Sequence, residues 1–167
     1  MSRLEFLSPA CARAEAGFEP RPRSPLAGAL PGGGASGIED ISLTVGKLEV
    51  RGEVAAIGVD AEVVRLTPER ALVLCSSERT AAIEAELRES FGAVIDVTGA
   101  LAGLRLKNPT LMRRLTELEL DRLPAVGAVA RVRTLVTRDA EGFRLFFPQE
   151  YGEYMARTIL DTARGLP

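Results

Sequence analysis

The sequence predicts an α+β fold with a mostly antiparallel sheet and helices packed on one of its faces. Three observations predict this class: short runs with alternating apolar side chains, turn residues at nearly every junction, and three segments with helical apolar periodicity among them. The chain has 167 residues, which suits one domain that buries roughly 70% of its unfolded surface.

Composition argues against several functional classes. The net charge of −2 argues against a nucleic-acid-binding surface, which normally carries a basic excess. No apolar run approaches the roughly 20 residues of a membrane span, and the N-terminus lacks the apolar core of a signal peptide. The absence of histidine removes the commonest general base and zinc ligand. Cys11 and Cys75 are far apart, which favours free thiols and a cytoplasmic location.

Residues 1–39 are rich in proline and glycine, which predicts a partly disordered N-terminal tail before a single domain over residues 40–167. Within this tail, residues 23–27 (RSPLA) form a short apolar segment. They either belong to a flexible tail or order against a partner subunit.

Strands are expected ahead of the first helix over residues 41–51, 63–66 and 71–75. Gly46 indicates a bulge or kink in the first of them. Residues 53–61 are compatible with a short helix or a loop. The turn residues TPER separate the second and third runs, which should form a hairpin.

The first helix is expected to open at residues 76–78 (SSE), where a serine would supply the N-cap oxygen. Ile83, Leu87 and Phe91 form its apolar stripe. Gly92 suits a left-handed C-terminal cap.

Two strands and a second helix come next. The strands are expected over residues 93–98 and 101–107, and residues 108–109 (Asn-Pro) should cap and start the helix. Its buried face would consist of Leu111, Leu115 and Leu118. Residues 123–124 (Leu-Pro) should end it.

A strand over residues 128–137 and a loop at 139–142 predict another hairpin. The returning strand would turn Phe143, Leu145 and Phe147 toward the core. The apolar face of the last helix would consist of Tyr151, Met155, Thr158, Ile159 and Thr162. Tyr151 and Tyr154 resemble a stacking platform, but their helical spacing favours core packing.

The sequence predicts no catalytic residue and no metal site. Residues 31–37 (PGGGASG) neither follow a strand nor open a helix, so they lack the geometry of a phosphate-binding loop. No cluster of cysteine, histidine and carboxylate residues has the spacing of metal ligands.

Asp96 is the one candidate for a cofactor-binding residue, because it interrupts the apolar run VIDVTG. It is either a ligand-binding or acid–base carboxylate, or a strand-end aspartate satisfied by Thr98 or by backbone donors. Arg131 and Arg133 either hold an anionic ligand or form a solvated or subunit-contacting face.

Several runs carry a family resemblance through their order and spacing. They are RSPLA at residues 23–27, GKL at 46–48, DVTGA at 96–100, LRL at 104–106, FRLFFP at 143–148 and Tyr151-x-x-Tyr154. This order resembles the gamma subunit of heterotetrameric sarcosine oxidase over most of the chain. The domain is also similar to the folate-binding aminomethyltransferase of glycine cleavage.

The resemblance implies a non-catalytic subunit of an oxidoreductase that oxidises N-methyl amino acids and passes the one-carbon unit to tetrahydrofolate. Partner alpha and beta subunits would carry FAD, FMN, NAD and tetrahydrofolate, and this chain would bind none of them. Gln149 and Glu150 stand where the family usually has Arg-Ser, which leaves the N-methyl substrate open.

If the chain is such a subunit, we expect an exposed apolar patch and a segment around Pro25 that orders only in the complex. The alternative is a free-standing folate-binding or aminomethyl-transferring domain that uses Asp96 in its pocket. A regulatory module without a ligand is the third interpretation.

Overall fold

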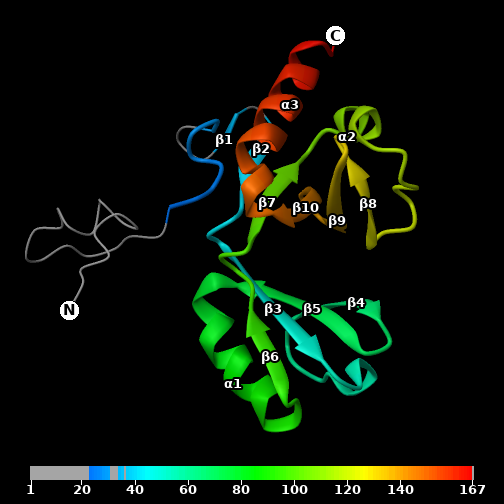
Figure 1. Cartoon of the computed structure of the whole chain (residues 1–167). Helices are drawn as coiled ribbons and strands as arrows, with labels where there is room; N and C mark the ends of the chain where they lie inside the picture. The colour runs from blue at the N-terminus through cyan, green and yellow to red at the C-terminus, as the bar shows by residue number, and fades with distance from the viewer. Residues whose placement is uncertain (1–22, 31–33, 36, 167) are drawn as a thin grey trace, which may run out of the picture.

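The computed structural model describes residues 23–30, 34–35 and 37–166, and it confirms the α+β class. The strands form two antiparallel sheets instead of one, and three α-helices accompany them (Figure 1). Each sheet carries its helices on one face only, as the sequence predicted for a single sheet.

The larger sheet has six strands. Its spatial order is β1 (Gly34–Ala35), β2 (Ile38–Asp40), β7 (Leu101–Leu106), β10 (Gly142–Pro148), β9 (Val132–Asp139) and β8 (Ala125–Val129). The helices α2 (Pro109–Leu115) and α3 (Gly152–Arg164) cover one face of it, and a 3₁₀ turn at Gln149–Tyr151 leads into α3.

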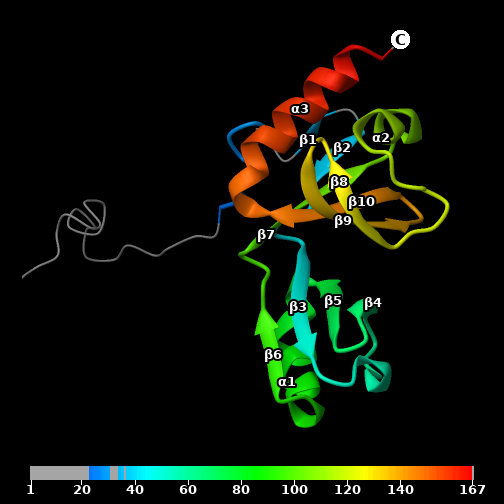
Figure 2. The same cartoon turned by 45° about the vertical axis from the view of Figure 1, so that its right-hand side comes forward.

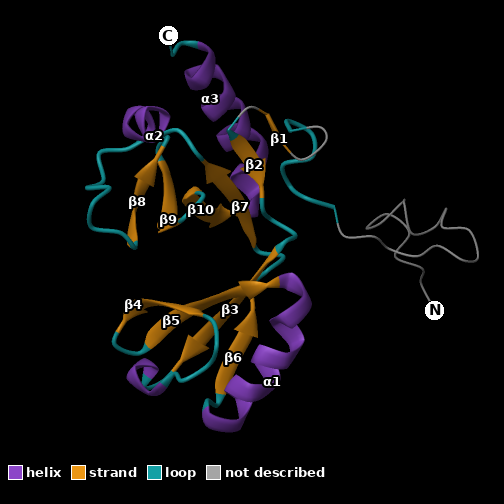
Figure 3. Ribbon diagram, turned by 180° about the vertical axis from the view of Figure 1, so that it is seen from behind, coloured by secondary structure: helices purple, strands orange, loops and turns teal. Residues whose placement is uncertain are grey.

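The smaller sheet has four strands. Its spatial order is β4 (Glu62–Thr67), β5 (Arg70–Ser76), β3 (Val45–Arg51) and β6 (Ala93–Asp96). The helix α1 (Thr80–Ser90) packs on one face, as Figure 3 shows from behind. Two 3₁₀ turns, Val54–Ala56 and Ser77–Arg79, complete this part.

The smaller sheet is an insertion in the larger one. Strands β2 and β7 pair with each other, yet residues 41–100 separate them in the chain. We call residues 45–96 the inserted lobe, and residues 23–40 and 101–166 the split lobe. Only two connections, residues 41–44 and 97–100, join the lobes (Figure 2).

The N-terminal segment belongs in part to the split lobe. Leu26 and Leu30 are 0% and 2% exposed and lie in the core with α2 and α3. The expected domain boundary after residue 39 falls inside β2. The segment around Pro25, expected to order on a partner, packs on this chain's own core instead, with Pro25 against Gly152 at the start of α3. Residues 1–22, which include Cys11, lie outside the described residues, and so does most of the 31–37 loop.

The inserted lobe follows the predicted order of elements with three differences. Gly46 makes no bulge, since β3 pairs with β5 in continuous register. It is needed for packing, because the Thr80 side chain occupies the place of a Cβ atom. The helix opens without a side-chain cap from a serine, and Gly92 does not adopt a left-handed conformation. The predicted hairpin of β4 and β5 is confirmed, and so is the burial of Ile83 and Leu87.

The split lobe differs most from prediction in one strand. The run expected over residues 128–137 is two strands, β8 and β9, joined by a tight turn at Ala130-Arg131. Both turn residues have positive φ, of 46° and 69°, where glycine or asparagine is usual, so the turn carried no sequence signal. Asn108 caps α2 as predicted, but that helix ends at Leu115, well before Leu123-Pro124.

The face of α3 is also shifted from its prediction. Met155 and Ile159 are buried as expected. Tyr151 and Tyr154 are 45% and 47% exposed, so the expectation that they pack in the core was wrong. Among the described residues the other exposed large apolar side chains are Leu43, Ile95 and Val126. Leu43 lies in a connection between the lobes, Ile95 in β6 and Val126 in β8, and the large apolar patch remains a prediction.

Candidate functional site

The two sheets face each other across an apolar centre. Strand alternation places every second side chain on this face. The buried residues of the centre are Ile41, Val64, Leu72, Leu74, Leu135 and Phe146. The helices of each lobe lie on the opposite face of its sheet, so side chains of both lobes meet in the space between the sheets.

This centre opens into a cleft of about 450 Å³. Its walls are mainly apolar, formed by Leu66, Leu72, Val97, Leu101, Val126, Leu135 and Phe146. Three charged residues, Glu49, Arg70 and Arg133, also line it. A cleft of this size with few polar groups is typical of small-molecule sites, and we call it the intersheet cleft.

Glu49 is the carboxylate of the cleft, and two arginines hold it. Arg70 donates to one carboxylate oxygen at 2.6 Å and Arg51 to the other at 2.8 Å. The hydrogen bond from Arg70 holds the pKa of Glu49 below its usual value, with Arg51 adding to the effect against the opposing effect of burial. The same contact raises the pKa of Arg70. Glu49 is therefore an ionised, neutralised group and is poorly suited to transfer a proton near neutral pH.

Lys47 lies beside the cleft and is fully buried. Its ammonium donates to the carbonyl of Ser42 at 2.8 Å and to that of Thr98 at 3.3 Å. Ser42 and Thr98 belong to the two connections between the lobes, so this one side chain links both. Burial lowers the pKa of Lys47 from 10.5 to about 8, although Asp96 and Asp40 act to raise it.

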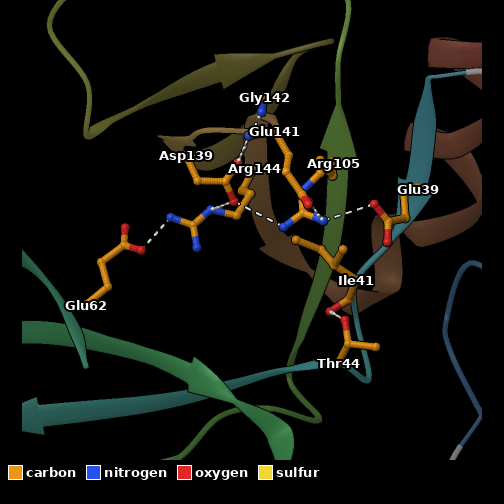
Figure 4. Close-up of polar contacts among 9 residues, drawn as sticks. All are labelled: Glu39, Ile41, Thr44, Glu62, Arg105, Asp139, Glu141, Gly142 and Arg144. Atoms are coloured by element: carbon orange, nitrogen blue, oxygen red, sulfur yellow. Dashed lines mark hydrogen bonds and ion pairs between the residues drawn. The ribbon is translucent and has the colours of Figure 1, made fainter. Parts of the chain in front are cut away.

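An ion cluster lies on the same face of the split lobe, at Arg105. The Arg105 guanidinium contacts Glu39 at 3.0 Å, Asp139 at 3.1 Å and Glu141 at 2.6 Å (Figure 4). Burial acts to lower the pKa of Arg105, but hydrogen bonds with Glu39 and Asp139 outweigh it and raise the pKa. Its Nε atom has no hydrogen-bond partner in the described part of the chain.

Arg144 extends this cluster to the inserted lobe. It pairs directly with Arg105 in the register of β10 and β7, and Asp139 lies between the two guanidinium groups. Its Nη2 contacts Glu62 of β4, so the ion pair bridges the two lobes (Figure 4). Its Nε is 3.3 Å from Asp139 but lacks hydrogen-bond geometry.

The pKa of Asp139 is lowered in this cluster. Burial acts to raise it, but the backbone amide of Glu141 and the guanidinium of Arg105 outweigh that effect. Asp139 therefore stays ionised between two arginines. The cluster is a fixed set of mutually neutralised charges, and such a set suits a structural bridge better than catalysis.

The predicted candidates do not converge on the intersheet cleft. Asp96 is exposed at the end of β6, and its carboxylate accepts from the backbone amide of Thr98 at 2.8 Å. This is the contact expected of a strand-end aspartate. Arg131 sits in the β8–β9 turn, whereas Arg133 lines the cleft, so the two arginines do not form one site. Tyr154 donates to the carbonyl of Ala130 at 3.1 Å.

Sequence reasoning missed Lys47, Arg105 and Arg144. Lys47 stands between Gly46 and Leu48 in an otherwise apolar strand, a pattern that could have marked it. Arg105 and Arg144 alternate with leucine and phenylalanine, which is also the pattern of a solvated face. Arg144 is 8% exposed because the second sheet packs on that face and brings Glu62 against it, whereas Arg105 is enclosed by acidic residues of its own lobe.

The described residues hold neither a metal-binding cluster nor a membrane-spanning helix. No group of three or more cysteine, histidine, aspartate or glutamate side chains there is placed to hold a metal ion. None of the helices described is long and apolar enough to cross a membrane.

The fold is similar to that of a chain in a solved multi-subunit enzyme. That structure is heterotetrameric sarcosine oxidase from Corynebacterium sp. U-96 in complex with pyrrole 2-carboxylate. The TM-score is 0.67 at 18% identity, and the match covers 86% of this chain and 95% of that one. Aspartokinase alpha and beta subunits match at a TM-score of 0.46 and 14% identity, over 78% of this chain and 98% of that chain. No model of a known protein family matches the sequence, and no characterised protein matches it significantly. The likeness to the chain of sarcosine oxidase establishes a shared fold.

Proposed function

We propose that this chain is a non-catalytic gamma-type subunit of a cytoplasmic, sarcosine-oxidase-type flavoenzyme. The complex would oxidise N-methyl amino acids and pass the one-carbon unit to tetrahydrofolate. Its alpha and beta subunits would carry FAD, FMN, NAD and tetrahydrofolate. The observation that carries the proposal is the fold match to a chain of heterotetrameric sarcosine oxidase, which spans nearly the whole of both chains.

The charge arrangement in the described residues supports a structural role. Glu49 is held by two arginines, and Asp139 lies between two more. Charges paired in this way give rigidity, whereas an acid–base catalyst needs a group with a pKa near the working pH. Lys47 has such a pKa, but its ammonium is fully buried and bonded to two carbonyl groups.

The second candidate function is folate binding by the chain itself. The size and apolar walls of the intersheet cleft favour it. Asp96, the carboxylate expected to serve it, is not among the residues that line the cleft. Glu49 would have to serve instead and would have to give up an arginine partner to do so.

Co-expression with the alpha and beta subunits of a sarcosine-oxidase-type flavoenzyme, followed by affinity purification, tests the proposal. We expect a stable complex that contains flavin and oxidises N-methyl amino acids. A chain that purifies alone under these conditions would contradict the subunit role. Titration of the isolated chain with tetrahydrofolate then decides the second candidate, and binding that is lost in Glu49→Gln would support it.

A further inference from the structure

A groove at the edge of the split lobe is rich in arginine. It has a volume of about 600 Å³ and lies between the end of α2 and the turn of the β8–β9 hairpin. Arg113, Arg114 and Arg131 line it, against a single acidic residue, Glu117. All four side chains are exposed. We call it the arginine groove.

Hydrogen bonds and a β-bridge hold the backbone around the arginine groove. The hydroxyl of Thr116 donates to the carbonyl of Ala128 at 2.7 Å, and the amide of Ala130 donates to the carbonyl of Leu115 at 2.7 Å. Thr116 also forms a β-bridge with Val129. The segment after α2 thus adds to the edge of the sheet, and its arginines project from a fixed frame.

Arg131 occupies a costly position in this frame. Its φ of 69° and that of Ala130, 46°, lie in the left-handed region, which side chains other than glycine, asparagine and aspartate avoid. The hydroxyl of Tyr154 donates to the carbonyl of Ala130 and holds the turn in place. Strain retained in this way is often linked to function. Here it presents a guanidinium group at the mouth of the groove.

The three arginines of the groove have no carboxylate partner among the described residues, whereas most other arginines of that part of the chain have one. The ion pairs of that part involve other arginines, such as Arg105 and Arg144. Within the described part of the chain, Arg114 donates only to the carbonyl of Gly165, at 3.5 Å. Part of the role of Arg113 and Arg114 is to offset the dipole at the end of α2. Arg131 comes from a different element and has no such role.

We infer that the arginine groove docks a carboxylate-rich segment of a partner protein. Guanidinium groups bind carboxylates through paired hydrogen bonds, and three of them in a short groove fit a short acidic segment. A nucleic acid is a poorer fit, because the chain is acidic overall, with a net charge of −2, and the groove is too short to follow a phosphate backbone. The inference deepens the proposed subunit role and rests on it for the identity of the partner.

Fluorescence anisotropy with a labelled hexaglutamate peptide at low salt tests the groove directly. The variant is Arg113→Gln combined with Arg114→Gln and Arg131→Asn. Glutamine keeps helix propensity in α2, and asparagine tolerates positive φ, so the fold is expected to persist. We expect the wild-type chain to bind the peptide and the triple variant to bind it about 10-fold more weakly, since each exposed ion pair contributes modestly.

A matched variant removes the same charge elsewhere. Arg65→Gln, Arg79→Gln and Arg157→Gln change exposed arginines outside the groove, and the combined variant should bind the peptide as the wild type does. Equal losses in both triple variants would show a general charge effect and overturn the inference. Tighter binding of single-stranded oligonucleotide than of hexaglutamate would also overturn it.

The co-purified complex provides the second arm of the test. If the wild type forms the complex, the groove variant should dissociate from it about 10-fold more readily than the matched variant. Equal affinity of the two variants would refute the groove while leaving the subunit role intact. If the wild type forms no complex, the subunit role fails, and the peptide assay alone decides whether the groove binds acidic chains.

Discussion

The two lobes are built from the sequence in different ways. The inserted lobe is one continuous segment, and its core joins residues from Leu48 to Val94. The split lobe joins two segments, and its core brings Leu26 together with Met155 and Ile159. The inserted lobe therefore depends on local contacts, whereas the split lobe needs the N-terminal segment to complete its core.

Leu26→Ala is the variant expected to have the largest effect on this comparison. Leu26 is 0% exposed in the split-lobe core, so its truncation should cost about 2–5 kcal/mol of unfolding free energy. Urea unfolding measures the loss. Amide hydrogen exchange should locate it in the strands of the split lobe, whereas Leu87→Ala, equally buried, should loosen the inserted lobe.

Leu43→Ala is the control, because Leu43 is 43% exposed and should change stability by less than about 0.5 kcal/mol. A Leu26→Ala variant as stable as this control would show that the N-terminal segment contributes nothing to the split lobe. The contrast between the lobes would then be lost.

Lys47→Met tests the linkage between the lobes through its pH dependence. The pKa of Lys47 falls from 10.5 in the unfolded chain to about 8 on folding, so the unfolded state binds more protons between these values. Stability should therefore rise with pH from 8 to 10.5, by about 3 kcal/mol relative to the methionine variant. Below pH 8 the difference between the two proteins should be constant.

Urea unfolding at several pH values between 7 and 11 measures this effect. Lys107→Met is the matched control, because Lys107 is the other lysine of the sequence and is exposed. Parallel stability curves for the wild type and Lys47→Met would mean that the buried ammonium keeps its usual pKa.

The order of elements in the inserted lobe was predictable, because its signals are local. The hairpin turn TPER and the stripe of Ile83 and Leu87 depend on neighbouring residues alone. The division into two sheets was not predictable in this way. The pairing of β2 with β7 crosses the whole inserted lobe, and no pattern within either strand encodes its partner.

The candidate site was harder to predict for the same reason. Arg144 becomes an interlobe bridge only because a second sheet covers its face of the first and brings Glu62 against it, whereas Arg105 contacts acidic residues of its own lobe. Asp96, which stood out in the sequence, lies at an exposed strand end. An apolar run predicts a strand even when a charged residue interrupts it. Whether that charged side chain is buried depends on which sheet packs on the strand.

Arg144→Met tests the ionic bridge between the lobes. Removal of Arg144 leaves Glu62 unpaired and takes one of two arginines from Asp139, which should cost about 1–2 kcal/mol at neutral pH. The pKa of Asp139 lies below its usual 3.8, so its share of this stability is present above pH 3.8 and is lost as the pH falls further.

Thermal unfolding at pH 7 and in acid measures the difference from the wild type. The exposed Arg65→Met, outside the cluster, should be nearly neutral at both pH values. If Arg144→Met matched Arg65→Met at pH 7, the ionic bridge would contribute nothing measurable to holding the lobes together.

The smallest effect is expected at the β8–β9 turn of the split lobe, where the sequence did not predict a hairpin. Replacing Ala130 with asparagine and Arg131 with glycine supplies the residues that tolerate their φ values of 46° and 69°. The change should stabilise the chain by about 0.5–1 kcal/mol, with an increase in the unfolding midpoint in urea.

The same variant should bind acidic peptide more weakly, because it removes one arginine of the groove. A gain in stability together with a loss of binding would mean that Arg131 is kept at this turn for its charge. A loss of stability would mean instead that the turn is not strained, and the argument from strain to function would fail at this position.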